Sequence, residues 1–288
     1  SFDYLGGNYY ISAASLLLEF RTFIDSHPSL FKVNATNPCW PKMVRYCEEL
    51  EKFPEIMRSI TRIHVSSQID FERALFCSWC SLLVARSLNL PENHQRTLFF
   101  AGLLQDTGKH SETDGLNEFS SKINGPFVSH IKDTTTKDLH PLVSATFLEK
   151  QLPELEGLCD LVLHHHAKAD GTGYPTNVSE SQLAIDNQVL IVANEISDRL
   201  DGLGGHNQIA HIMPNLKLNY LLYFDKVHLG WISLFEPHIP SVSSNSNLPA
   251  LKDEVIEKVH DLESMLSCLL VVSAELLPFD FDFKVHGL

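Results

Sequence analysis

Apolar residues recur every three to four positions along most of this chain, a spacing that predicts amphipathic helices. No segment alternates apolar and polar residues with period two, and no Asn-Gly hairpin turn lies between apolar runs. The pattern therefore predicts an all-α fold, arranged as a helical bundle. The expected helices cover residues 8–32 (ending near His27-Pro28), 43–53, 55–64, 69–90, 98–109, 140–150, 155–166 and 188–200.

Changes in composition predict three parts. Residues 1–66 would form an N-terminal helical subdomain or cap, residues 67–236 the main helical domain, and residues 237–288 a linker and a C-terminal helix. The linker includes the Ser/Asn-rich run 241–247. The helix, at about 249–277, carries a heptad-like apolar seam that packs either on this chain, which we slightly favour, or on a second copy as a homodimer contact.

Composition removes some classes of function. The formal net charge of −14 argues against a general DNA binder, because little here neutralises a phosphate backbone, although a local pocket could still hold a small nucleotide. No N-terminal signal pattern is present, and the tract 265–277 is interrupted by Glu275 and too short to span a membrane. The first residue is Ser rather than Met, so an upstream domain could precede it.

The six cysteines are scattered along the chain, which favours a reduced, cytoplasmic compartment. Cys77 and Cys80 form a Cys-x-x-Cys motif without a second pair, inside an apolar helical run. We therefore interpret both as core residues and not as zinc ligands.

The candidate chemistry lies in three segments. His164-His165-His166 follow an apolar run and precede the loop Asp170-Gly-Thr-Gly-Tyr-Pro175. Imidazoles are good ligands for first-row metals, and glycines let backbone N–H groups approach phosphate oxygens. The buried helix expected at 98–109 ends on Gln105-Asp106-Thr107-Gly108-Lys109, and His140-Pro141 opens another helix. Together these segments indicate a metal-phosphate site.

With these motifs in view, residues 70–235 resemble the HD-GYP family, a branch of the HD phosphohydrolase superfamily. The most specific feature is the Asp-Gly-x-Gly-Tyr-Pro loop after paired histidines, and Leu-Leu-x-Asp-x-Gly-Lys adds independent support. The resemblance implies an HD-domain-like all-α fold that binds two or three iron, manganese or similar ions. It also implies hydrolysis of the bacterial second messenger cyclic-di-GMP.

The resemblance assigns roles to matching residues. Asp106 matches a metal-bridging carboxylate, and Lys109 matches a lysine that contacts substrate phosphate; these two are the candidate catalytic residues. The other expected metal ligands are His140, His165 and His166. The residues expected beside the nucleotide are Gly171, Gly173, Tyr174 and Pro175, together with Lys109.

The chain also departs from the family pattern. Gln105 stands for the histidine of the His-Asp motif, Ala167 for a glutamate, Arg73 for an early ligand histidine, and Asn194 for a late ligand aspartate. An arginine repels a metal ion and an amide is a weak ligand. A full two-metal site is therefore disfavoured, and we expect one Fe or Mn ion on Asp106, His140, His165 and His166. Candidates to restore a lost ligand are Asp70, Glu195 and Asp198.

Three hypotheses follow. The first, which we favour, is a degenerate HD-GYP-like signalling domain, catalytically impaired, that acts by binding cyclic-di-GMP or a protein partner; Arg73 would then hold a nucleotide phosphate directly. The second is an active metal-dependent phosphodiesterase with altered ligands. The third is a protein-interaction module that binds no nucleotide.

Overall fold

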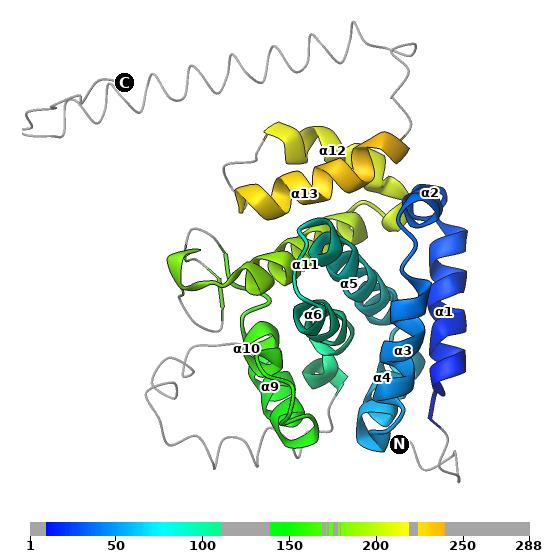
Figure 1. Ribbon diagram of the computed structural model, residues 1–288, viewed down its shortest axis with the longest axis vertical. Coiled ribbons are helices and arrows are strands. Elements are labelled where there is room, and N and C mark those ends of the chain that lie inside the picture. Colours follow the sequence, from blue (N-terminus) through cyan, green and yellow to red (C-terminus); the bar gives the residue numbers. More distant parts are fainter. Residues whose placement is uncertain are drawn as a thin grey trace, which may run out of the picture. The chain divides into compact units, whose positions relative to one another are not determined.

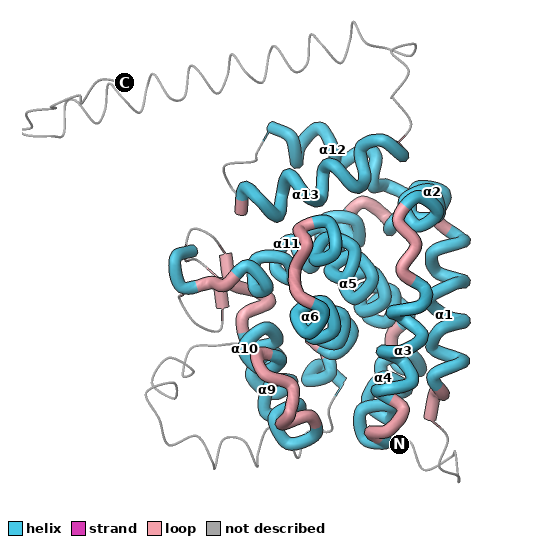
Figure 2. The backbone as a smooth tube through the Cα atoms, viewed as in Figure 1, coloured by secondary structure: helices cyan, strands magenta, loops and turns pink. Residues whose placement is uncertain are grey.

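The computed structural model describes residues 10–110, 139–168, 171, 173–174, 178, 180–218 and 224–239. Within these ranges the secondary structure is helical and contains no strand, which confirms the all-α prediction (Figures 1 and 2). The chain divides into two compact units, Ser1–Ile239 and Pro240–Leu288. The predicted linker at 241–247 and the predicted helix at 249–277 lie outside the described residues, as do residues 111–138.

Four helices precede the helices that carry the candidate site. The expected end near His27-Pro28 is confirmed, since His27 is extended (φ −115°, ψ 102°) and ends the first helix. Pro28 then starts a second helix, because proline is tolerated in the first helical turn. The connection from this second helix to the next one covers only residues 37–39. The four helices are α1 Ala13–Ser26, α2 Pro28–Thr36, α3 Trp40–Leu50 and α4 Pro54–Ser66.

Helices α5 (Gln68–Ser87) and α6 (Glu92–Leu104) form the centre of the bundle and are buried over most of their length. Their close approach requires Gly102, since a Cβ there would lie 2.5 Å from the backbone nitrogen of Ser78. Cys77 and Cys80 are fully buried in α5, which confirms them as core residues. Trp231 of α13 (Asp225–Phe235) donates its indole N–H to the Cys80 sulfur at 3.0 Å.

The other α-helices that the structure describes in this unit are α9 (His140–Gln151), α10 (Leu158–Leu163), α11 (Ile185–Gly202) and α12 (Ile209–Leu218). Helix α11 packs on α5 and α6, α10 packs on α6, α9 packs on α10, and α12 packs on α11 and α13. Two predicted helices end earlier than expected. The 98–109 helix ends at Leu104 and continues as the 3₁₀ turn η1 (Thr107–His110), and the 155–166 helix covers only α10. His165 and His166 therefore lie in a turn after a helix.

Aromatic rings connect the N-terminal helices to α6. Phe20 of α1 stacks on Phe99 with ring centroids 5.5 Å apart, and Tyr46 of α3 lies 5.5 Å from the same ring. These helices and the helices of the site share one hydrophobic core. Among the described helices, none is both long and apolar enough to cross a bilayer.

Candidate metal centre

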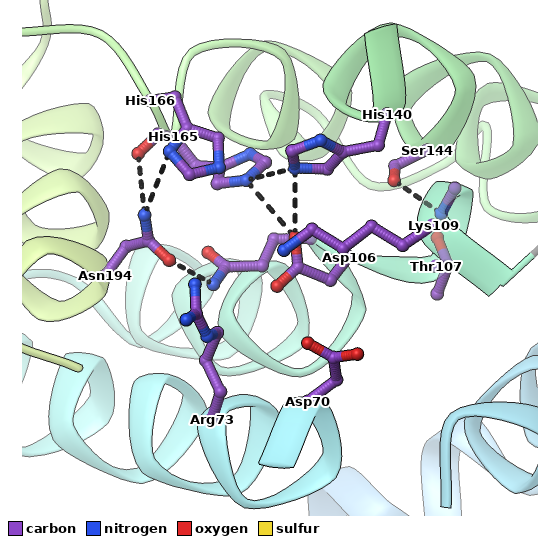
Figure 3. A network of polar contacts seen from close by, with 12 residues as sticks. Asp70, Arg73, Asp106, Thr107, Lys109, His140, Ser144, His165, His166 and Asn194 are labelled. Atoms are coloured by element: carbon purple, nitrogen blue, oxygen red, sulfur yellow. Dashed lines mark hydrogen bonds and ion pairs between the residues drawn. The ribbon is translucent and has the colours of Figure 1, made fainter. Parts of the chain in front are cut away.

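Three separate segments bring one carboxylate and three imidazoles together (Figure 3). Asp106 follows the end of α6, His140 is the first residue of α9, and His165 and His166 follow α10. One ligand atom from each of the four residues lies within 4.8 Å of the others. The four residues expected to hold a metal are thus neighbours in space.

One oxygen of Asp106 is the centre of this group. Asp106 Oδ1 lies 2.9 Å from Lys109 Nζ, 3.1 Å from His140 Nε2 and 3.5 Å from His165 Nε2. It receives no hydrogen bond of good geometry from any of them, although the carboxylate is only 2 % exposed. Burial alone would raise the pKa of Asp106, but contacts with His140 and His165 and the charge of Lys109 outweigh it and hold this pKa well below its usual range.

The ring of His165 presents a lone pair to the site. Its Nδ1 lies 2.6 Å from the carbonyl oxygen of Val162. Because a carbonyl oxygen can only accept a hydrogen bond, the proton is on Nδ1 and Nε2 is unprotonated. His140 Nε2 lies 3.2 Å from this unprotonated nitrogen. Burial lowers the pKa of both His165 and His166, with the neighbouring histidines adding to the effect, so both rings are neutral.

The Gly-Tyr segment packs directly on His166. Tyr174 stacks on its ring at 4.5 Å with an interplanar angle of 20°, and its backbone N–H donates to the His166 carbonyl at 3.3 Å. This approach requires Gly173, because a Cβ there would lie 2.4 Å from that carbonyl oxygen. Gly171 has a positive φ of 78°, which favours glycine. Pro175 lies outside the described residues.

These residues fit one divalent transition metal. Histidine nitrogens with a carboxylate oxygen are a suitable donor set for iron, manganese or zinc. Asp106 Oδ1 and His166 Nε2 are buried polar atoms without a hydrogen-bond partner, although buried polar atoms normally have one. An ion held by the four residues would supply the missing contact of Asp106 Oδ1, and that of His166 Nε2 when this nitrogen carries no proton. Asp106, His140, His165 and His166 are the residues that would hold the ion.

Three of the four departures from the family pattern, Gln105, Arg73 and Asn194, form a second polar group beside the first, whereas Ala167 is a buried apolar residue. Gln105, 0 % exposed, donates from Nε2 to Asn194 Oδ1 at 2.9 Å. Arg73, on α5, points toward the side chain of Asn194 (Figure 3). It forms ion pairs with Asp198 and, at 2.7 Å, with Asp201. Amides and a paired cation thus occupy the space next to the ligands.

Two other carboxylates that were candidates to restore a lost ligand, Glu195 and Asp70, form contacts outside the four-ligand group. Glu195 pairs with Arg199 at 2.9 Å on the same helix. Asp70 lies 3.0 Å from His110 Nε2, and this contact lowers the pKa of Asp70.

Sequence reasoning missed two residues that fix the segment after Asp106. His110 ends η1 and contacts Asp70 through Nε2 and the Ser66 hydroxyl through Nδ1, at 2.7 Å. Ser144 of α9 accepts the Gly108 N–H at 2.8 Å. No local sequence pattern marks these contacts, because they join positions 36 to 44 residues apart.

An all-α fold in which one buried aspartate meets histidines from two later segments defines the class of HD-type phosphohydrolase-like domains. A family model described as HD domain matches residues 65–209, half of the chain. The chain belongs to the HD domain family.

One curated relative is a Pseudomonas aeruginosa protein named as a cyclic di-GMP phosphodiesterase. It is 28 % identical over 136 residues, which cover 46 % of this chain and 31 % of the relative. The chain thus matches less than a third of that protein's length. No solved structure matches the chain.

Proposed function

We propose that this chain is a degenerate HD-GYP-like signalling domain that binds cyclic-di-GMP or a related nucleotide beside a single divalent metal ion, with hydrolysis lost or strongly impaired. The observation that carries the proposal is a four-ligand group lying against a buried Gln105–Asn194 amide pair. One half of the site has metal ligands, and the other half has two neutral amides and the ion-paired Arg73.

Electrostatics favours one ion over two. Two divalent ions carry four positive charges, and a buried charge of that size needs compensation by carboxylates. Asp106 is the single carboxylate of the four-ligand group, and the nearby Arg73 adds a further positive charge. Asp198 and Asp201 are paired with that arginine and balance its charge first.

Basic groups around the ligands suit a phosphodiester. Lys109 is partly exposed beside Asp106 and could meet a phosphate oxygen from there. The Gly173–Tyr174 segment offers an aromatic ring next to His166. Arg73 would hold phosphate only by sharing its guanidinium with Asp198 and Asp201, so we assign it the weaker contribution. A bound ion would supply the positive charge that polarises a phosphate, and the residues named here would position that phosphate.

The proposal is tested by titration calorimetry of the full chain with manganese or ferrous iron under anaerobic conditions, followed by cyclic-di-GMP. We expect about one ion per chain and micromolar nucleotide binding. Asp106→Asn should abolish metal binding. The matched control is Asp225→Asn, which changes an aspartate in α13, away from the ligands. No nucleotide binding would contradict the proposal and favour an interaction module.

A second candidate is an active phosphodiesterase with altered ligands, favoured by the retained contact between Asp106 and Lys109 at 2.9 Å. The same metal-loaded protein is incubated with cyclic-di-GMP, and nucleotide products are separated. We expect no product. Linear dinucleotide or mononucleotide, lost in Asp106→Asn, would establish the second candidate instead.

The same proposal includes domain boundaries after residues 66 and 236. It also includes a protein signalling partner and a homodimer formed through residues 249–277. Light scattering of the full chain and of a chain ending at Ile239 tests the dimer. A full chain that is a dimer and a truncated chain that is a monomer would support the dimer. The same number of chains per particle in both proteins would contradict it.

A further inference from the structure

The side chain of Asn194 connects the amide pair to the ligand group. Asn194 is buried on α11, and its Nδ2 lies 3.5 Å from the backbone oxygen of His165 and 3.3 Å from Nδ1 of His166. Its Oδ1 accepts the N–H of Gln105 at 2.9 Å. A backbone carbonyl can only accept, so the NH₂ group of Asn194 faces the histidine turn and its oxygen faces Gln105.

This orientation determines where His166 carries its proton. Because Asn194 donates to Nδ1, that nitrogen uses its lone pair as an acceptor. A neutral imidazole has one N–H and one lone pair, so the proton of His166 is on Nε2. His165 has the opposite tautomer, with its proton on Nδ1 facing the Val162 carbonyl. Two consecutive histidines thus present different groups to the site.

We infer that Asn194 is a positioning residue that controls whether His166 can bind a metal ion, with Gln105 holding Asn194 in the unfavourable orientation. A nitrogen that carries a proton has no lone pair for a metal. For Nε2 to become a ligand, the proton of His166 must move to Nδ1, and Asn194 must then present its oxygen there. This inference rests on the metal site of the proposed function and adds a constraint on it.

The contacts of Gln105 describe what that change requires. When Asn194 turns its oxygen toward His166, its NH₂ group turns toward Gln105 and needs an acceptor. Gln105 Oε1 is buried and has no hydrogen-bond partner, so a turn of the Gln105 amide would supply one. The turn also gives up the contact between Asn194 and the His165 carbonyl. The two amides must therefore turn together, and this cost lowers the affinity of the fourth ligand.

The test is nitrogen-15 NMR of the histidine rings in the full chain without added metal, because the shifts of Nδ1 and Nε2 distinguish the two tautomers. We expect His166 to be protonated on Nε2 in the natural sequence. In Asn194→Asp, the carboxylate can only accept, so the proton should move to Nδ1. The matched control is Asn93→Asp, the same exchange at an exposed position of α6, and it should leave the His166 shifts unchanged.

Metal titration supplies the second measurement. We expect Asn194→Asp to bind manganese or zinc at least tenfold more tightly. Gln105→Leu removes the donor to Asn194 without adding charge, so it should also strengthen binding, by a smaller factor. Proton on Nδ1 in the natural sequence, or an unchanged tautomer in Asn194→Asp, would overturn the inference. A chain that binds no metal would contradict the proposed function, whereas the ring shifts would still decide the role of Asn194.

Discussion

Lys109 Nζ lies 2.9 Å from Asp106 Oδ1, the same oxygen that faces His140 and His165. An ammonium and a divalent ion repel each other, so they compete for this carboxylate. We expect Lys109→Met to bind manganese more tightly, by about tenfold, as a lost competing interaction of about 1.4 kcal/mol would give. Titration calorimetry measures the change.

The same substitution should weaken the protein without metal. Removing Lys109 leaves the buried Asp106 less compensated, which costs about 1–3 kcal/mol in the free energy of unfolding. Urea unfolding with and without manganese checks this. Lys168→Met removes an equal charge from an exposed side chain beside the turn and serves as the control. Equal metal affinity in both variants would show that Lys109 does not compete for the oxygen.

Gly173→Ala should disturb the site through the backbone. Its Cβ would lie 2.4 Å from the His166 carbonyl oxygen, so the segment must shift and Tyr174 must leave its stacked position. We expect a loss of about 1–3 kcal/mol of stability, as in other overpacked sites. Metal affinity should also fall, since the ring of His166 loses its support. Thermal unfolding and calorimetry measure both effects.

Gly202→Ala is the matched control for this substitution. Gly202 ends α11, and a Cβ there would meet no atom within 4 Å. Its stability and metal affinity should equal those of the natural sequence. A similar loss in both variants would mean that Gly173 has no special role.

His206 should make stability depend on pH. It packs between Phe23 and Phe76, and burial, aided by the positive charges of His27 and Arg73, lowers its pKa to about 3. An unfolded histidine titrates near about 6.5. Between these values the unfolded chain binds a proton that the folded chain does not. The stability that neutral His206 contributes is therefore fully present above about pH 6.5 and is lost, by up to about 1.4 kcal/mol per pH unit, as pH decreases toward 3.

The measurement is the free energy of unfolding by urea at several values between pH 4 and pH 8. His206→Phe removes one of the buried histidines that titrate and should reduce the slope in the acidic half, to which His165 and His166 also contribute. His211→Gln replaces an exposed histidine of α12 and should retain the slope of the natural sequence. An unchanged slope in His206→Phe would assign the acid sensitivity to other groups.

Arg73 should be more important for stability than for phosphate binding. Its side chain is 13 % exposed and joins α5 to Asp198 and Asp201 of α11. Arg73→Met should cost about 2 kcal/mol, less than a fully buried pair, because Asp198 is 42 % exposed. The matched control is Arg199→Met, which removes a surface pair on α11 and should cost less than about 1 kcal/mol. Equal stability losses would contradict the interpretation, and a large loss of cyclic-di-GMP affinity in a folded Arg73→Met protein would show that Arg73 holds the nucleotide.

Local patterns predicted the helices well. The break at His27 follows from Pro28, and the buried α6 follows from its continuous apolar residues. The exact ends of the helices were harder to predict, because the 3₁₀ turn after Leu104 and the left-handed Gly157 before α10 depend on tertiary contacts. Residue type and motif order predicted that Asp106, His140, His165 and His166 belong to one metal site, and the fold brings these four residues together.

The contacts between side chains could not be predicted in the same way. Gln105 and Asn194 are 89 residues apart, and an amide leaves no periodic signal in a sequence. The pairing of Arg73 with Asp201, across 128 residues, is equally invisible. These contacts follow from how α5, α6 and α11 pack, and they decide what the departures from the family pattern do.

The packing of Phe20 and Tyr46 against Phe99 has a consequence for any shortened form of this protein. A fragment cut to the region of family similarity, residues 65–209, would retain every candidate ligand but expose the aromatic back of α6 to water. Such a fragment would tend to aggregate through that surface. Helices α1 and α3 thus shield the apolar surface of α6, the helix that precedes Asp106. A soluble shortened form of the protein should therefore retain them.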